Sequence, residues 1–313
     1  MWANIPYDYA FYEFPELTPR LASGITDRDP VVWYLCAMVA ELAYYNVPAF
    51  EMRDDDRRRA KLVPCDSYNE IIARAQGPTD VELLLGRLRF GDFGIQSFVR
   101  YTDNTLVLAM LHQKMLFIGF RGTRFLFDFG IDFRTELVEQ PEALDRFGMN
   151  GRVHRGFAAE AERITRTIEK ALGEANWVFE YVLLCGHSLG GAVAALSQPL
   201  IRRSIGCDAR AYLFASPRYG DDAAYSGAMV PPVSIQRPDD PIPYWPRISG
   251  YADHPKPIDT SGMPISGKRN SAGTTSDVLL HRSEHEMGRY RRELGVPASA
   301  ISRMNYLVPF PRW

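Results

Sequence analysis

Long apolar runs and closely spaced cysteines are both missing from this 313-residue chain. No stretch approaches the roughly 18 consecutive apolar residues of a membrane-spanning helix, so we expect no transmembrane segment. The four cysteines are Cys36, Cys65, Cys185 and Cys207. They form no close pair, which argues against a disulfide framework or a zinc site and predicts buried thiols. The N-terminus does not resemble a secretory signal, so a cytoplasmic location is expected, with secretion and peripheral membrane association left open.

An excess of charge of either sign is also missing. Lysine and arginine number 36 against 38 aspartates and glutamates, for a formal net charge of −2, so we expect no nucleic-acid partner. The hydrophobic content of 46% is typical of globular proteins and predicts a sizeable core. We find no internal repeat and no flexible linker. The sequence therefore predicts a single domain over residues 31–313, with residues 1–30 as an N-terminal extension packed on it.

The order of the expected elements indicates the fold class. Residues 29–46 form an apolar segment of helical length, with Asp29 as a plausible N-cap before Pro30. Strands are expected within 95–120 and over 177–186, 209–216 and 232–237, and helices over 156–173, 189–205 and around 284–294, the last after a surface excursion over 238–277. Strands that alternate with helices predict an α/β protein with a mixed, largely parallel sheet flanked by helices.

One pentapeptide carries the strongest chemical signal. Residues 186–190, GHSLG, fit G-x-S-x-G, a sharp strand-to-helix turn on which a nucleophilic serine has a strained backbone. Only small residues fit two positions to either side of that serine. An expected strand precedes the turn and an expected helix follows it. The pattern therefore favours an activated Ser188 over a glycine turn with an incidental serine.

A serine becomes nucleophilic when a histidine takes its proton and a carboxylate orients that histidine. The histidines that follow Ser188 are His254, His281 and His285. Asp239 and Asp240 follow an expected strand, where a triad carboxylate is best placed. The residue types alone leave the choice among these candidates open.

Six short blocks occur in the order and approximate spacing of the class 3 lipases, the fungal triacylglycerol lipase-like group, which this chain resembles. They are FRGT at 120–123, VHRGF at 153–157, GHSLGG at 186–191, SPRYGD at 216–221, DPIP at 240–243, and His285 followed by Tyr290. The resemblance covers about residues 31–294, and six ordered blocks make it specific. It implies an α/β-hydrolase fold with a lid segment.

The resemblance also selects among the candidates for the triad. The family's catalytic aspartate immediately precedes a short apolar-proline element, which implies Asp240 rather than Asp239. Its catalytic histidine stands five residues before a tyrosine, which implies His285 rather than His281. The resemblance thus implies a triad of Ser188, Asp240 and His285.

A metal site is the competing interpretation of the histidines. His281 and His285 are one helical turn apart, a spacing that could hold a metal, but no third ligand stands at a suitable spacing. The resemblance makes His254 structural. We therefore expect neither a metal nor an organic cofactor.

An oxyanion hole and a lid are further implications of the resemblance. The backbone N–H of Leu189, at the start of a helix, is one expected oxyanion donor, and Thr123 is the second. The stretch 124–133 matches the lid of related lipases, a short amphipathic helix that covers the serine in water and opens at a lipid surface. Lid and acyl-chain contacts are expected from Phe125, Leu126, Phe127 and Phe129.

Two residues of this stretch depart from the family pattern. Phe129 stands where the family usually has tryptophan, and Gly130 weakens a helix. The alternative, an apolar segment permanently buried in the core, therefore stays open for residues 124–133.

These residues predict a serine ester hydrolase that cleaves lipid or long-chain acyl esters, like a triacylglycerol lipase, at a lipid–water interface. The same constellation serves a phospholipase A1, a monoacylglycerol lipase or a feruloyl-type esterase, and the six blocks do not separate these. An inactive homologue that binds lipid or protein is the alternative outside the enzymes. The complete set of serine, aspartate, histidine and oxyanion threonine argues against it.

Overall fold

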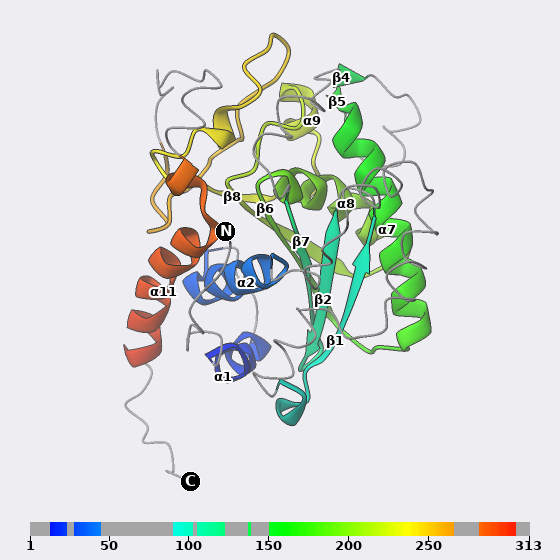
Figure 1. Ribbon diagram of the computed structural model, residues 1–313, viewed down its shortest axis with the longest axis vertical. Helices are drawn as coiled ribbons and strands as arrows, with labels where there is room; N and C mark the ends of the chain where they lie inside the picture. The colour runs from blue at the N-terminus through cyan, green and yellow to red at the C-terminus, as the bar shows by residue number, and fades with distance from the viewer. Residues whose placement is uncertain are drawn as a thin grey trace, which may run out of the picture.

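The computed structural model describes residues 13–23, 28–44, 90–102, 105–122, 137–138, 150–265 and 282–304. A six-stranded sheet in the order β1-β2-β3-β6-β7-β8 lies at the centre of this part of the chain (Figure 1). Its strands are β1 (Gln96–Tyr101), β2 (Leu106–His112), β3 (Met115–Phe120), β6 (Tyr181–His187), β7 (Asp208–Phe214) and β8 (Val233–Ile235). A short pair, β4 (Leu137–Val138) and β5 (Val153–His154), forms a second sheet.

The central sheet is mixed. Strands β1, β2 and β3 pair antiparallel, and the turn between β2 and β3 has positive φ at Gln113 and Lys114, as a two-residue hairpin requires. Strands β3, β6, β7 and β8 pair parallel, because helices cross over between them. The predicted α/β class with a largely parallel sheet is therefore confirmed.

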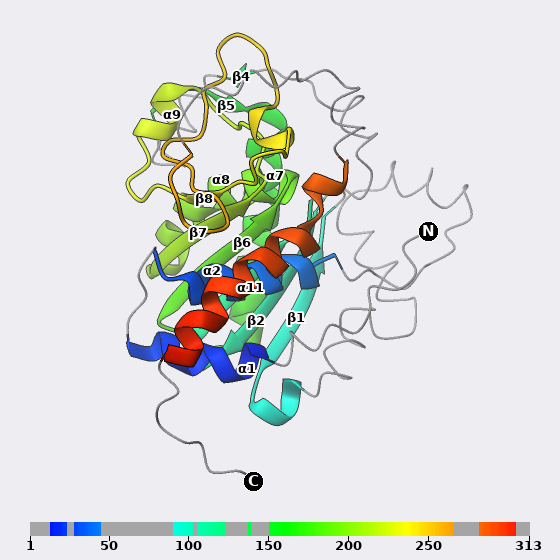
Figure 2. The ribbon, with the colours of Figure 1, turned by 90° about the vertical axis from the view of Figure 1, so that its left-hand side faces the viewer.

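Helices cover both faces of this sheet (Figure 2). Helices α2 (Pro30–Leu42) and α11 (Met287–Met304) lie on one face, and α7 (Arg155–Ala175) and α8 (Leu189–Ile205) on the other. Strand β2 is buried along its whole length, and its side chains alternate between the two cores. Leu106, Leu108 and Met110 pack with α2, whereas Val107, Ala109 and Leu111 pack with α7 and α8.

Most expected elements are present, with shifted ends. The carboxylate of Asp29 accepts the N–H of Val31 at 2.8 Å and caps α2 as predicted. Strand β7 ends at Phe214, two residues before the expected end, because Ala215 has a φ of 51° that an extended strand does not allow. The final helix, α11, starts at Met287, after a 3₁₀ turn over Arg282–His285.

Short helices were not predicted from the sequence. They are α1 (Phe14–Leu17), the 3₁₀ helices at Thr18–Ser23, Phe90–Phe93 and Ile242–Tyr244, and α9 (Asp222–Ser226). Phe14 and Leu17 lie in the same core as α2, although the division at residue 30 stays a prediction. Cys36 and Cys185 are buried free thiols, Cys207 is half-buried, and Cys65 lies outside the described residues. Within the described ranges, no helix has the length and apolar character needed to cross a membrane.

Candidate active site

Ser188 lies on the turn between β6 and α8. Its backbone is strained, with φ 57° and ψ −133°, and the residue is 2% exposed. A Cβ at Gly186 would collide with the carbonyl oxygen of Gly190, and a Cβ at Gly190 would collide with that of Phe120. Gly186 therefore allows the turn to close against Gly190, and Gly190 allows it to pack against the end of β3.

Asp240 and His285 meet at the same end of the sheet as Ser188, where the parallel strands have their carboxyl ends. Nδ1 of His285 is 2.9 Å from Oδ2 of Asp240 and 3.2 Å from Oδ1, and both side chains are buried. The backbone N–H of Ile242 donates to Oδ1 at 2.9 Å, which fixes the carboxylate. Because Asp240 accepts at Nδ1, the other ring nitrogen of a neutral His285 is left to accept a proton.

Tyr290 completes the surroundings of the carboxylate. Its hydroxyl donates to Oδ2 of Asp240 at 2.9 Å and accepts the backbone N–H of Arg237 at 2.9 Å. Burial, reinforced by the charge of Asp240, raises the pKa of Tyr290 well above its ordinary value, so this hydroxyl keeps its proton. The carboxylate of Asp240 thus receives three donors, from Ile242, His285 and Tyr290.

An ion-pair cluster holds the segment that carries His285. The guanidinium of Arg237 lies 2.7 Å from the carboxylate of Glu284 and 2.8 Å from that of Glu293. It also donates to the backbone carbonyl of Glu284 at 2.8 Å, directly before the histidine. These ion pairs raise the pKa of Arg237 and lower that of Glu284 despite partial burial, so both groups stay charged. The segment after β8 is thereby tied to the 3₁₀ turn of His285.

The hydroxyl of Ser188 has no hydrogen-bond partner among the described residues, and no hydrogen bond joins it to His285. Its neighbour His187 nevertheless lies against that histidine. The two imidazole rings have centroids 4.6 Å apart, and Nε2 of His187 is 2.8 Å from the backbone carbonyl of His285. Catalytic hydrogen bonds are often formed only once a substrate is bound, so this arrangement is compatible with proton transfer.

One of the two expected oxyanion donors, Leu189, lies within the described residues. Leu189 is the first residue of α8, so its N–H has no carbonyl within the helix to bond. Gly122 lies beside the serine, since a Cβ built on it would be 3.0 Å from Cβ of Ser188. Thr123 comes next in the chain and lies outside the described residues, as do Phe125, Leu126, Phe127 and Phe129.

The triad candidates that the resemblance did not select have different surroundings. Asp239 is exposed, and His281 lies outside the described residues. His254 is buried, with Nε2 3.0 Å from the carbonyl of Ser216, and burial lowers its pKa to about 4. Across the described ranges, no group of three or more histidine, cysteine or acidic side chains could hold a metal ion.

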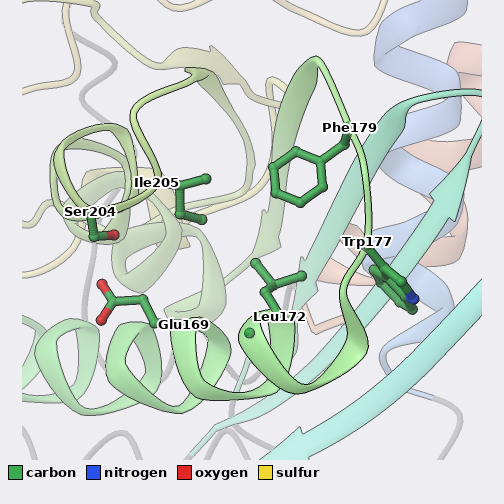
Figure 3. Close-up of a pocket in the computed structure, with 7 residues that line it drawn as sticks. Glu169, Leu172, Trp177, Phe179, Ser204 and Ile205 are labelled. Carbon is green, nitrogen blue, oxygen red and sulfur yellow. The ribbon is translucent and has the colours of Figure 1, made fainter.

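A groove of about 320 Å³ lies far from Ser188, between the last turns of α7 and α8 (Figure 3). Leu172, Phe179 and Ile205 point toward one another in it. Ser188 precedes the first residue of α8, whereas Ile205 is its last residue, so the length of this helix separates the groove from the serine. The groove has no part in the candidate site.

Sequence reasoning left three of these residues without a role: Tyr44, His187 and Arg237. The hydroxyl of Tyr44, just beyond α2, is 2.7 Å from Nδ1 of His187. The one available signal was a polar histidine at the end of an otherwise apolar strand, β6. Its partners come from distant parts of the chain and leave no local pattern.

Comparisons with known proteins give a family and a fold for this chain. A family model described as lipase (class 3) matches residues 117–249. "Lipase A" of Sodiomyces alcalophilus is 28% identical over 208 residues, which are 56% of this chain and 49% of that protein. "Phospholipase A1-IIgamma" of Arabidopsis thaliana is 27% identical over 198 residues, or 53% of this chain and 47% of that protein.

A third relative is "secreted mono- and diacylglycerol lipase 1" of Fusarium solani, 33% identical over 114 residues, or 34% of this chain and 33% of that protein. The chain spans about half or less of the length of these curated relatives. Among solved structures, the Lip2 lipase of Yarrowia lipolytica superposes with a TM-score of 0.52 at 16% identity, over 82% of this chain and 91% of that one. This likeness shows a shared fold, the α/β-hydrolase fold.

Proposed function

This chain belongs to the class 3 lipase family, and we propose that it is a serine hydrolase that cleaves lipid or other long-chain acyl esters. The observation that carries the proposal is the convergence of three segments at the carboxyl ends of the parallel strands. The strained turn of Ser188 adjoins His187, whose ring lies against His285, and His285 is bonded to Asp240. A binding module has no need of this combination.

In the proposed mechanism, His285 takes the proton of the Ser188 hydroxyl as the oxygen attacks the ester carbonyl. Asp240 orients the imidazole and stabilises its charged form. The backbone N–H of Leu189 and the N–H and hydroxyl of Thr123 stabilise the oxyanion of the tetrahedral intermediate. His285 then gives its proton to the leaving alcohol, and water hydrolyses the acyl-enzyme through the same histidine.

Residues 124–133 are the proposed lid and acyl-chain wall, with contacts from Phe125, Leu126, Phe127 and Phe129. The position of Gly122 beside Ser188 supports this proposal, because the stretch begins two residues further along the chain. Such a stretch would cover the serine in water and contact a lipid surface when it opens. The proposed partner is therefore a lipid–water interface, as well as the ester itself.

The names of the relatives imply different esters: they are a lipase, a phospholipase A1, and a mono- and diacylglycerol lipase. Head-group choice depends on the lid and on the pocket walls. We propose acylglycerols as the substrate class, and a head-group panel tests this choice against phospholipids and feruloyl esters.

Covalent labelling tests the nucleophile directly. We expect an organophosphonate serine probe to add one adduct to the wild-type protein and none to Ser188→Ala. Ser197→Ala is the matched control, because Ser197 is a buried serine on α8, the helix that follows Ser188, and this variant should label like the wild type. An unlabelled wild-type protein, or a labelled Ser188→Ala, would overturn the proposed function.

A panel of esters that differ in chain length tests the lid. We expect the hydrolysis rate to rise sharply once a long-chain ester exceeds its solubility limit and forms an emulsion. A short-chain ester that stays in solution provides the baseline. A rate that passes through the solubility limit without a rise would favour an esterase of soluble substrates over an interfacial lipase.

A further inference from the structure

Three hydrogen bonds connect the loop after β3, the turn of Ser188 and the segment of His285. The backbone N–H of Gly122 donates to the hydroxyl oxygen of Tyr44 at 3.1 Å. That oxygen is 2.7 Å from Nδ1 of His187, and Nε2 of His187 is 2.8 Å from the backbone carbonyl oxygen of His285. The loop after β3, the nucleophile turn and the histidine segment thus share one continuous chain of hydrogen bonds.

Only one arrangement of protons satisfies all three bonds with neutral side chains. The carbonyl of His285 can only accept, so Nε2 of His187 carries the hydrogen and Nδ1 is the acceptor. The hydroxyl of Tyr44 must then donate to Nδ1, and its oxygen accepts from Gly122. Burial, together with the neighbouring His285, lowers the pKa of His187, and burial raises the pKa of Tyr44, so both stay neutral.

Each segment that these hydrogen bonds connect adjoins or contains a group with a proposed role. Gly122 directly precedes Thr123, and His187 directly precedes Ser188. His285 is the proposed base, whose side chain is held by Asp240 while its backbone carbonyl is held by His187. The ring of His187 also lies against that of His285, with an interplanar angle of 33°. The hydrogen bonds therefore fix the relative positions of Gly122, the turn of Ser188 and the segment of His285.

These hydrogen bonds through Tyr44 and His187 form what we call the relay. The packing allows little freedom around it. A Cβ on Gly122 would be 2.5 Å from the hydroxyl oxygen of Tyr44 and 2.7 Å from the backbone carbonyl oxygen of His187. The rings of Tyr44 and His187 meet edge-on, with centroids 5.5 Å apart. A backbone shift in any one of the three segments would therefore be transmitted to the others.

We propose that Tyr44 and His187 are positioning residues, whose relay sets the distance between the oxyanion donors and the catalytic serine and histidine. This inference rests on the proposed function, because it concerns the same reaction. The relay acts on the transition state, in which the oxyanion is formed and His285 is charged. A neutral His187 beside His285 adds no positive charge to oppose that state.

Tyr44→Phe removes the hydroxyl and keeps the ring. Tyr225→Phe is a matched control, because the hydroxyl of buried Tyr225 likewise accepts a backbone N–H, that of Tyr219, at 3.1 Å. On a soluble short-chain ester, we expect Tyr44→Phe to lower kcat by about 10- to 100-fold with KM within about twofold of wild type. Tyr225→Phe should keep the wild-type kcat, although both variants leave a buried N–H without its acceptor.

A boronic acid inhibitor, which becomes tetrahedral when the oxygen of Ser188 adds to boron, gives a second readout. Its affinity should fall in Tyr44→Phe by about the same factor as kcat/KM, because it tests the oxyanion site without turnover. His187→Phe breaks the same relay from the other side and replaces Tyr44→Phe if that variant does not fold. The double variant should be about as slow as the slower single variant, since the two residues act as a unit.

The relay is overturned if a folded Tyr44→Phe or His187→Phe keeps the wild-type kcat, or if their effects on kcat multiply in the double variant. An increase in KM alone would also overturn it, because that would indicate a role in substrate binding. Probe labelling of the wild-type serine separates this result from a failure of the proposed function. A labelled wild type with an active Tyr44→Phe refutes only the relay.

Discussion

Oδ2 of Asp240 lies 2.9 Å from Nδ1 of His285, although 45 positions separate the two residues in the chain. Asp240 follows β8, and His285 ends the 3₁₀ turn before α11, so their contact depends on the packing of these two segments. The ion pairs between Arg237 and both Glu284 and Glu293 join the same segments. The position of the histidine is therefore determined by the fold around it and by one carboxylate.

Asp240→Asn should lower kcat by about 10³- to 10⁴-fold, because an amide at this position no longer selects the His285 tautomer that accepts the serine proton. Asp239→Asn makes the same chemical change one residue earlier, at an exposed side chain, and should stay near wild type. Kinetics on a soluble ester, with thermal melting to verify folding, measure both. Equal losses in the two variants would contradict the assignment of Asp240.

His285→Ala should abolish labelling by the serine probe at neutral pH, because Ser188 then has no base, whereas His281→Ala should label at about the wild-type rate. The two histidines are close in sequence, and the residue types alone left the choice between them open. The rate of adduct formation followed by mass spectrometry distinguishes them. Slow labelling of His281→Ala with a fast His285→Ala would reverse the assignment.

The local elements of the fold could be predicted because their causes are local. Asp29 and Pro30 mark the start of α2, as their residue types predict. The turn of Ser188 was predictable for the same reason, since its glycines and flanking elements are contiguous. The ends of elements were less predictable where one backbone angle decides them, as at Ala215 after β7.

The relay could not be predicted, because its causes lie far apart in the chain. Tyr44 and His187 are 143 positions apart, and nothing in either neighbourhood indicates that α2 brings the hydroxyl to the end of β6. Tyr290 was predictable from the sequence only in part. Its spacing from His285 implied the choice of that histidine, but its hydrogen bond to Asp240 depends on the packing of α11 against α2.

Gly190→Ala should destabilise the protein by about 1–3 kcal/mol or more and reduce labelling of Ser188, because the added Cβ would collide with the carbonyl oxygen of Phe120. Gly173→Ala provides the control. A Cβ at Gly173, near the end of α7, meets nothing within 4 Å, so alanine should stabilise that helix by about 0.5–1 kcal/mol. Urea unfolding measures both changes. A loss of stability in Gly173→Ala equal to that in Gly190→Ala would argue against the packing of the turn as the cause.

Buried histidines predict that stability falls as the pH is lowered from 6.5 toward 5. Burial lowers the pKa of His154 and of His254 to about 4, and burial with the neighbouring His285 lowers that of His187. Below the ordinary histidine pKa of about 6.5, the unfolded chain binds protons that the folded protein does not, so the free energy of unfolding decreases. Each histidine contributes a slope of up to about 1.4 kcal/mol per pH unit in this window.

Urea unfolding at a series of pH values between 7 and 5 measures this slope. His254→Gln should reduce this slope by the contribution of about one proton. Glutamine keeps an N–H donor for the carbonyls of Ser216 and Pro217 but does not titrate. The variant's stability at pH 7 serves as its own reference, so a general loss of stability does not affect the comparison. A wild-type free energy of unfolding that stays constant down to pH 5, or a slope unchanged in His254→Gln, would mean that this histidine is not held neutral by burial.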